Sequence, residues 1–307
     1  MSTLLIVNPH ATTTRGWVRD AIADGLSELG SVEVVTTTHR GHATTVAAEA
    51  RRAGVQRVAT FGGDGTINEA VNGLLATGPG DDVPVLLPIP GGHTNVLPRV
   101  LGIPQDPLEA TGALTEAARS GWVRHLGLGR ADDRWFLFSA GAGLDAEVLR
   151  RVEQQRAHGA RASIPRYVAT AVLAHAQSLS PGQPQLSIAF PDGSVIESVY
   201  TAIIQNAPVW TYAGSLPVTF APDADFERGL AVFGIRSLDP LRLANHLALA
   251  TLRPAWLDGA SAAGGLAEFE LRSAQPMPLQ VDGDVVGVRT RVSVRHHARV
   301  LPVAVPN

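Results

Sequence analysis

The sequence Gly-Gly-Asp-Gly-Thr begins at residue 62, directly after an apolar run that ends at Phe61. Apolar residues at helical spacing follow from Ile67. A strand that enters a helix through glycines exposes the first N–H groups of that helix, and such groups attract phosphate. Asp64 lies among them, where a carboxylate suits holding Mg²⁺, orienting a water or accepting a proton. The alternative is a glycine turn in which Asp64 only caps the helix.

The composition describes a globular chain that contains neither lysine nor cysteine. Its 307 residues exceed the usual size of one domain, so two domains are expected. All 25 basic side chains are arginine, which excludes a Walker A loop because that loop needs lysine. The absence of cysteine excludes thiolate metal sites and cysteine nucleophiles.

The net charge and the lengths of the apolar runs limit the classes of partner that the chain can have. A net charge of −3 gives no general attraction to nucleic acid, so no nucleic-acid partner is expected. The run Leu4–Val7 is too short for a signal segment, and no apolar run approaches the length of a membrane span. We therefore expect a cytoplasmic protein whose contact with membranes, if it has any, is peripheral.

The first third of the chain alternates strands with helices. Strands are predicted at residues 4–7, 32–36, 56–61 and 83–89, and helices at 17–29, 43–52, 65–76 and 107–119. This alternation predicts a parallel sheet covered on both faces, whose ligands gather at the carboxyl ends of the strands. Four polar or glycine positions follow those ends: Asn8, Thr37, Gly63 and Gly92.

The rest of the chain is rich in strands. They are predicted at residues 122–129, 135–140, 185–190, 195–205, 216–220, 230–235, 269–273, 279–281, 290–296 and 300–303, with helices at 144–156, 165–179 and 240–252 and a small-residue loop at 260–265. Several of these segments carry aromatic side chains, which we expect to be buried in the core of the domain; the alternative is that they line a groove for an acyl chain. These residues are Trp135, Phe136, Phe138, Trp210 and Tyr212.

Together these patterns predict an α/β domain with a parallel sheet, plus a second, mainly antiparallel β-sandwich-like domain; that the first is a nucleotide-binding domain is implied by the resemblance described next. The first is expected to span residues 1–124, with residues from about 290 to 307 as a segment that could return to it. The second, a β-rich substrate domain, is expected to span residues 125–289.

An ordered set of motifs resembles the diacylglycerol kinase catalytic family, which includes soluble bacterial lipid kinases and sphingosine kinases. The set comprises Asn8-Pro9, Thr37 with Gly41-His42-Ala43, GGDGTINEAVNGLL from residue 62, PGGHTNVLPRVLGIP from 90, FSAGAGLDAEV from 138 and VDGD from 281. The Gly-Gly-Asp-Gly core alone also occurs in NAD kinases and phosphofructokinases, so the specificity lies in the order of the set.

The resemblance implies ATP and Mg²⁺ as cofactors and a lipid as substrate, with an interdomain cleft for the transfer. It implies nucleotide contacts at Asn8, Pro9, Thr12, Thr37, Gly62, Gly63, Asp64, Gly65, Thr66, Asn68, Glu69, Gly92, His93, Thr94 and Asn95. Asp64 is also the candidate carboxylate beside ATP-bound Mg²⁺. The acidic centre is implied at Asp64, Asp282 and Asp284, and the last of these is the favoured proton acceptor.

This chain departs from the family pattern at three places. The loop after Asn8-Pro9 lacks a Ser-Gly ending, so its hydroxyl comes from Thr12 or Thr13. His93 stands where a threonine or serine hydroxyl is common. Arg228 stands at an acidic position of a structural Mg²⁺ motif and cannot ligate a metal, although it could pair with Asp223 or Asp225.

The function predicted is transfer of the γ-phosphate of ATP to the hydroxyl of diacylglycerol or a related lipid. A kinase of a small soluble alcohol or of NAD is one alternative, and a catalytically silent lipid- or nucleotide-binding protein is another. A basic segment could supply peripheral contact with anionic lipid, or it could be a solvated helix face: Arg150, Arg151, Arg156, Arg161 and Arg166.

Overall fold

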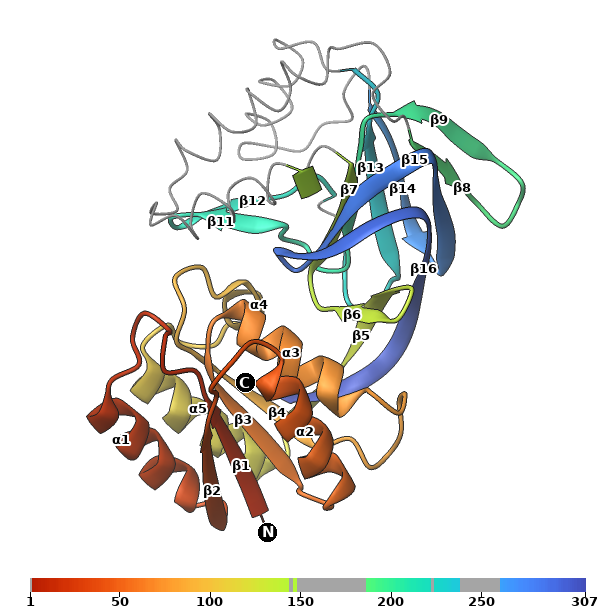
Figure 1. Cartoon of the computed structure of the whole chain (residues 1–307). Coiled ribbons are helices and arrows are strands. Elements are labelled where there is room, and N and C mark those ends of the chain that lie inside the picture. Colours follow the sequence, from red (N-terminus) through yellow and green to blue (C-terminus); the bar gives the residue numbers. More distant parts are fainter. Residues whose placement is uncertain (1, 144–145, 148–185, 222–223, 238–259) are drawn as a thin grey trace. The chain divides into compact units, whose positions relative to one another are not determined.

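The computed structural model describes residues 2–143, 146–147, 186–221, 224–237 and 260–307 (Figure 1). The chain divides into two compact units, which are residues 1–128 with 298–307 and residues 129–297. The C-terminal segment belongs to the first unit from Ala298 onward. From the sequence, the segment that could return to the first domain was expected to begin at about residue 290. Apart from residues 146–147, which are helical, the predicted helix at 144–156 lies outside the described residues, as do the predicted helices at 165–179 and 240–252 and the arginines from Arg150 to Arg166.

The first unit contains the predicted parallel sheet. Its strands are β1 (Ser2–Val7), β2 (Ser31–Thr36), β3 (Arg57–Gly62) and β4 (Val85–Pro90), in the order β4-β3-β1-β2. The end of β16 (Asp284–Ala304) adds a parallel pairing through Val303 and Leu86. Because Val7 pairs with both Thr36 and Phe61, and Gly62 with Pro90, all four carboxyl ends lie at one edge.

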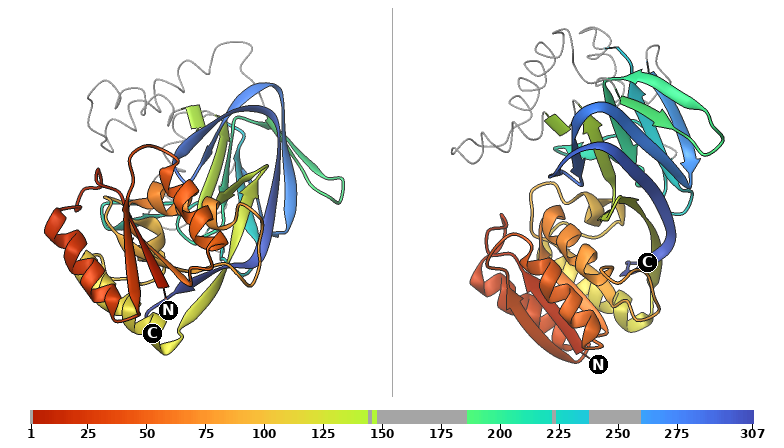
Figure 2. Two further views of the ribbon diagram at one scale, coloured as in Figure 1. Left: turned by 60° about the horizontal axis from the view of Figure 1, so that its bottom comes forward. Right: turned by 45° about the vertical axis from the view of Figure 1, so that its right-hand side comes forward.

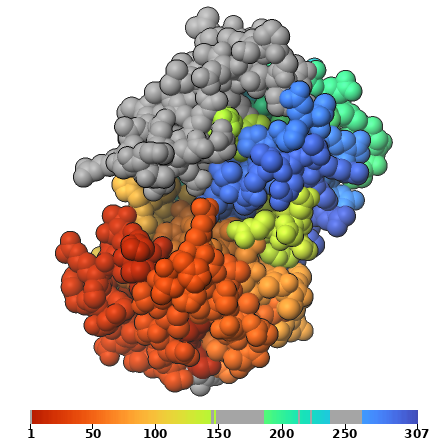
Figure 3. All heavy atoms as spheres, in the orientation of Figure 1, coloured from red at the N-terminus to blue at the C-terminus, as the bar shows by residue number. Residues whose placement is uncertain are grey.

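Helices cover both faces of this sheet, as the views in Figures 1 and 2 show. On one face lie α1 (Gly16–Ser27) and α5 (Pro107–Ser120), and on the other lie α2 (His42–Arg52) and α3 (Asp64–Leu74). The outer side of α2 appears in orange on the face drawn in Figure 3. The short helix α4 (Val96–Val100) follows β4 and was missed by the sequence prediction.

Two features fix α3 against α2. A Cβ atom added to Gly73 of α3 would lie 2.1 Å from the carbonyl oxygen of Thr44, so the two helix backbones meet there without a side chain between them. The buried guanidinium of Arg51 donates to the carbonyl oxygens of Leu74 and Gly78, at 2.6 Å each, and also forms a bidentate pair with Asp82. The helix that carries Asp64 is therefore held against α2 at its C-terminal end.

The second unit is antiparallel. Its main path runs β14-β13-β10-β7-β15-β16. Apart from β16, these strands are β7 (Ser139–Gly143), β10 (Thr201–Gln205), β13 (Leu230–Ile235), β14 (Ala260–Leu266) and β15 (Glu268–Val281). The hairpin of β8 (Leu186–Ala189) and β9 (Val195–Val199) joins β15, and β5 (Val123–Ala131) pairs with β6 (Arg134–Phe136). A separate hairpin consists of β11 (Thr211–Ala213) and β12 (Leu216–Val218).

Several strand predictions need correction. The strands predicted at 269–273 and 279–281 both belong to β15, and those predicted at 290–296 and 300–303 both belong to β16. The loop predicted at residues 260–265 is wrong, because this segment is β14 and pairs antiparallel with β13, Ala262 opposite Phe233. Small residues suggested a loop, but pairing with a neighbouring strand decides the conformation. The run 195–205 is two strands that separate at Tyr200, and the run 135–140 splits between Phe136 and Ser139.

The predicted core of the second unit is confirmed for three of its aromatic residues. Trp135, Phe136 and Phe138 are buried, which excludes them as the lining of an open acyl-chain groove. Trp210 instead packs on a smaller cluster that includes Phe220 and Phe233. Among the described residues, no helix combines the length and the hydropathy needed to cross a bilayer.

Candidate functional site

The loops after β3 and β4 pack backbone against backbone at the carboxyl edge of the first unit's sheet. A Cβ atom added to Gly92 would lie 2.6 Å from Cα of Gly63, and one added to Gly91 would lie 2.9 Å from the backbone nitrogen of Gly62. The N–H of Gly91 donates to the carbonyl oxygen of Gly62 at 2.8 Å. Only glycine allows this approach, so the two loops form one glycine-lined surface at the start of α3.

No side chain caps α3, because its N-cap residue is Gly63. The positive end of the helix dipole therefore lies at the carboxyl edge of the sheet, and the N-cap residue has no side chain that could accept hydrogen bonds from the first N–H groups of the helix. This is the arrangement that binds phosphate or another anion. The geometry agrees with the interpretation of residues 62–66 as a phosphate loop.

Asp64 caps a different helix from the one that it begins. Its carboxylate accepts hydrogen bonds from the N–H groups of Val96 at 3.0 Å and Leu97 at 3.3 Å, in the first turn of α4. The N-cap of α4 is Asn95, which has a left-handed backbone with φ of 50°. Asp64 thus ties the first glycine loop to the second across 32 residues of chain.

Burial raises the pKa of Asp64 above its ordinary value. The N–H groups of Val96 and Leu97, and the charge of Arg99, lower it and offset part of that rise. The carboxylate is half-buried and both its oxygens accept backbone hydrogen bonds, so its geometry suits holding the loops in position.

Asn8 and Thr13 tie the loop after β1 to the same surface. The side-chain amide of Asn8 donates to Oγ1 of Thr66 at 3.0 Å, and Asn8 Oδ1 accepts from the N–H of His10 at 3.0 Å. The N–H and the hydroxyl of Thr13 each donate to the carbonyl oxygen of Gly91 at 3.2 Å. Of the two hydroxyls that the sequence offered, that of Thr13 already has an acceptor, and Thr12 is exposed.

Glu69 ties the loop after β2 to α3. Its carboxylate accepts from the N–H of Gly41, the N-cap of α2, at 2.9 Å, while its carbonyl oxygen accepts from the hydroxyl of Thr44 at 3.0 Å. Glu69 therefore caps α2 in the way that Asp64 caps α4. The three loops that surround α3 are each bonded to one residue of that helix: Thr66, Asp64 and Glu69.

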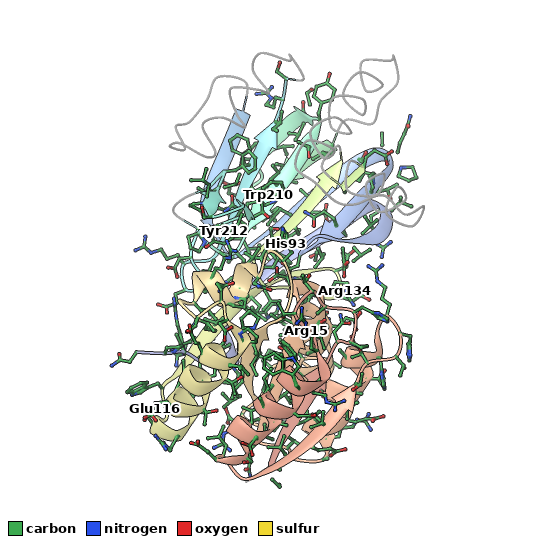
Figure 4. The ribbon with its side chains drawn as sticks, turned by 90° about the vertical axis from the view of Figure 1, so that its left-hand side faces the viewer. Arg15, His93, Glu116, Arg134, Trp210 and Tyr212 are labelled. Atoms are coloured by element: carbon green, nitrogen blue, oxygen red, sulfur yellow. The ribbon has the colours of Figure 1, made fainter. Side chains whose placement is uncertain are left out.

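The remaining predicted contacts lie within α3 and in the loops after β2 and β4. Asn68 is buried within α3, and its side-chain oxygen accepts from the amide of Asn72 at 3.0 Å. Thr37 lies at the end of β2, where its N–H donates to the carbonyl oxygen of Val7. His93, labelled in Figure 4, lies exposed in the loop between β4 and α4, beside the half-buried Thr94.

Sequence reasoning missed Gly91 and the residues that receive the caps, Gly41, Val96 and Leu97. Gly91 stood in the quoted motif but was not counted among the contacts, although its carbonyl oxygen accepts two hydrogen bonds from Thr13. The caps join residues 28 and 32 positions apart. Local capping rules cannot detect them, because those rules look only a few residues along the chain.

The acidic turn at residues 282–284 belongs to the second unit. The carboxylate of Asp282 accepts from the N–H groups of Leu137 at 2.7 Å and of Phe138 and Ser139 at 3.0 Å each. The prediction that Asp282 accepts backbone hydrogen bonds is confirmed. Asp284, half-buried at the first position of β16, follows the exposed Gly283.

The segment from residue 224 forms a turn. Oδ1 of Asp225 accepts from the N–H of Glu227 at 2.8 Å, and the carbonyl oxygen of Asp225 accepts from the N–H of Arg228. Arg228 is exposed, and Asp223 lies outside the described residues. Within the described ranges, no group of three or more histidine, aspartate or glutamate side chains is arranged to hold a metal ion.

The close packing of the glycine loops gives a testable expectation for Gly92→Ala. The new methyl group would meet the backbone of Gly63, which cannot rotate away, so the loops must separate at a cost of about 1–3 kcal/mol. We expect a lower melting temperature and weaker ATP binding by calorimetry. Gly112→Ala is the matched control, because nothing lies within 4 Å of its Cβ position, and unchanged ATP binding in Gly92→Ala would contradict the expectation.

Comparisons with known proteins agree with this geometry. Residues 2–130 match the diacylglycerol kinase catalytic domain. The diacylglycerol kinase of Bacillus subtilis is 36% identical over 144 residues, which are 45% of this chain and 45% of that protein. A probable lipid kinase YegS-like protein of Chromohalobacter salexigens is 32% identical over 43% of this chain and 40% of its own length. These matches cover less than half the length of the curated relatives.

Solved structures extend the similarity of fold to nearly the whole chain. A candidate diacylglycerol kinase from Bacillus anthracis has a TM-score of 0.77 at 21% identity and covers 99% of this chain, which in turn covers 96% of that structure's chain. An NAD kinase from Archaeoglobus fulgidus has a TM-score of 0.53 at 13% identity, over 100% of this chain and 94% of its own. The predicted fold class, a parallel α/β domain with a second β-rich domain, is confirmed. The resemblance to the diacylglycerol kinase catalytic family is thereby confirmed for residues 2–130, and the whole chain has the fold of these kinases.

Proposed function

We propose that this protein is a lipid kinase that transfers the γ-phosphate of ATP to the hydroxyl of diacylglycerol or a related lipid. The observation that carries the proposal is the match of residues 2–130 to the diacylglycerol kinase catalytic domain. The glycine-lined surface at the start of α3 supports it, because phosphates bind to such backbone N–H groups.

The first unit would bind the nucleotide through its carboxyl-edge loops. The N–H groups at residues 63–65 and the loop at residues 92–95 would receive the phosphates, and Asn8 would hold the loops through Thr66. In a phosphoryl transfer with a loose transition state, such positioning and charge stabilisation supply most of the catalysis. Asp64 and Glu69 would act as positioning residues for α4 and α2.

Mg²⁺ bound to ATP would neutralise the phosphate charges. Asp64 fits as the nearby carboxylate, because Mg²⁺ takes few protein carboxylates and keeps several of its waters. The Asp64 oxygens accept backbone N–H groups of α4, and a carboxylate has about four acceptor positions, so acceptor capacity remains for a hydrogen bond from a metal-bound water.

Asp284 would accept the proton of the lipid hydroxyl. Asp282 already directs both carboxylate oxygens at three backbone N–H groups, which leaves Asp284 as the carboxylate of this turn for the reaction. In the family that the sequence resembles, this turn is often Asp-Gly-Glu; Asp284 is one methylene shorter than that glutamate, so it needs a closer approach of the hydroxyl.

Radiolabelled ATP tests the proposal when the protein is offered diacylglycerol, NAD and glycerol in parallel reactions. We expect label in phosphatidic acid, separated by thin-layer chromatography. Label in NADP or in glycerol phosphate would instead identify one of the soluble-substrate alternatives. ATP binding without transfer to any acceptor would identify a silent nucleotide-binding protein.

A further inference from the structure

The β11–β12 hairpin of the second unit is a two-stranded sheet separate from the main sheet. Among the residues that the structure describes, its strands, Thr211–Ala213 and Leu216–Val218, pair only with each other, through a two-residue turn that begins at Gly214 with φ of 66°. An isolated two-stranded hairpin is marginally stable in water, so its base must be anchored. Figure 1 shows both strands as a short ribbon beside the larger sheet.

Aromatic rings anchor that base. The N–H of Trp210 donates to the carbonyl oxygen of Val218 at 2.9 Å and closes the hairpin. The Trp210 ring meets Phe220 edge-on at 5.3 Å between centroids, and Phe220 packs against Phe233 of β13 at 5.4 Å. The hairpin is therefore fixed to the sheet at one end, and Trp210 and Tyr212, labelled in Figure 4, are only partly buried.

The other end of the hairpin is apolar and uncharged. Leu216 is 59% exposed, and the neighbouring Pro217 is exposed as well. From Ser198 to Ala221 the chain carries no charged residue. A single exposed leucine is common on protein surfaces, so the absence of nearby charges in the sequence is the informative feature.

Val195 is an exposed apolar residue of the same unit whose sequence neighbours, unlike those of Leu216, are charged. It is 47% exposed on β9, but Asp192 and Glu197 flank it in the sequence. Charged residues close to an apolar side chain oppose its transfer out of water, because each charge would lose hydration. The tip around Leu216 carries no such neighbours along its strands, and it is backed by tryptophan and tyrosine, whose rings suit the boundary between water and lipid.

We propose that the β11–β12 hairpin contacts the surface of a lipid bilayer, with Leu216 inserted among the lipids and Trp210 and Tyr212 at the boundary. The proposal rests on the proposed lipid kinase function, which requires the enzyme to meet a substrate held in a membrane. An uncharged apolar tip fits that occupant, since binding at a bilayer surface scales with the apolar area that it removes from water.

Cosedimentation with vesicles of phosphatidylcholine and diacylglycerol tests the proposal. Wild-type protein is expected to bind, and Leu216→Asp is expected to bind at least about tenfold more weakly, because the burial of one leucine is lost. Val195→Asp adds the same charge at an exposed valine of the same unit and should bind as the wild type does. If Leu216→Asp has a lowered melting temperature, Leu216→Ser replaces it as the test variant. Leu216→Ser is also expected to bind the vesicles more weakly than the wild type.

Several outcomes would overturn the proposal. These are absence of wild-type binding, equal binding by wild type and Leu216→Asp, and equal losses in both aspartate variants. A change in oligomeric mass of Leu216→Asp without lipid would show that a second copy of the chain covers the hairpin instead. If wild type binds vesicles through Leu216 but phosphorylates no lipid, the proposed function fails and the membrane contact stands.

Discussion

Asp284→Asn lowers kcat for lipid phosphorylation by at least about a hundredfold, with little change in KM for ATP and in melting temperature. The estimate follows from the contribution of a general base, which is about 10² to 10⁴ in rate. Asparagine keeps the size of the side chain and cannot accept the hydroxyl proton. Because Asp284 is only half-buried at the first position of β16, the amide should be accommodated without loss of fold.

Asp284→Glu separates the charge of this residue from its reach. Glutamate restores the side chain that many relatives carry here, so activity should equal or exceed that of the wild type. Steady-state kinetics and thermal melts on the two purified variants decide the assignment. A loss of less than about tenfold in a folded Asp284→Asn would show that another group accepts the proton.

The parallel sheet was predictable because its signals are local. Buried strands such as residues 4–7 and 56–61 are short apolar runs, and the helices between them have apolar residues at helical spacing. The alternation then fixes a parallel sheet, and the carboxyl ends follow from its direction. The observed pairing of Val7 with Thr36 and Phe61 is the expected result.

The interactions that organise the candidate site were not predictable, because they join distant parts of the chain. The sequence offered Asp64 as a metal ligand, a base or a local helix cap. Its carboxylate instead caps α4, and Glu69 similarly caps α2. A carboxylate in a first turn always suits a local cap, so nothing in the sequence near Asp64 distinguishes the two roles.

Asp282→Asn is expected to reduce the free energy of unfolding by about 3 kcal/mol or more. The carboxylate accepts three N–H groups from residues 137–139, all of them buried. An asparagine can keep the two bonds at Oδ1, from Phe138 and Ser139, but it loses the charge and turns an N–H₂ group toward the N–H of Leu137. Each buried N–H left without an acceptor costs about 1–3 kcal/mol. The backbone of Asp282 is left-handed with φ of 47°, a conformation that asparagine tolerates, so backbone strain does not add to the effect.

Asn206 shows why the loss should spread beyond the turn. Its side-chain amide donates to the carbonyl oxygen of Leu137 at 2.8 Å, and its N–H donates to that of Phe138 at 2.9 Å. The segment between β6 and β7 is thus held by Asp282 through its N–H groups and by Asn206 through its carbonyl groups. Release of one side leaves buried polar groups in the core beside Phe136.

Asp132→Asn provides the matched control for Asp282→Asn. Asp132 also has a left-handed backbone, with φ of 52°, but its exposed carboxylate accepts a hydrogen bond from the N–H of Ser293 at 2.9 Å and otherwise lies 3.6 Å from Nε of Arg289. The same substitution there should cost no more than about 1 kcal/mol. Urea unfolding of both variants measures the difference. If Asp282→Asn keeps the stability of the wild type and loses kcat while Asp284→Asn stays active, the roles of the two carboxylates are exchanged.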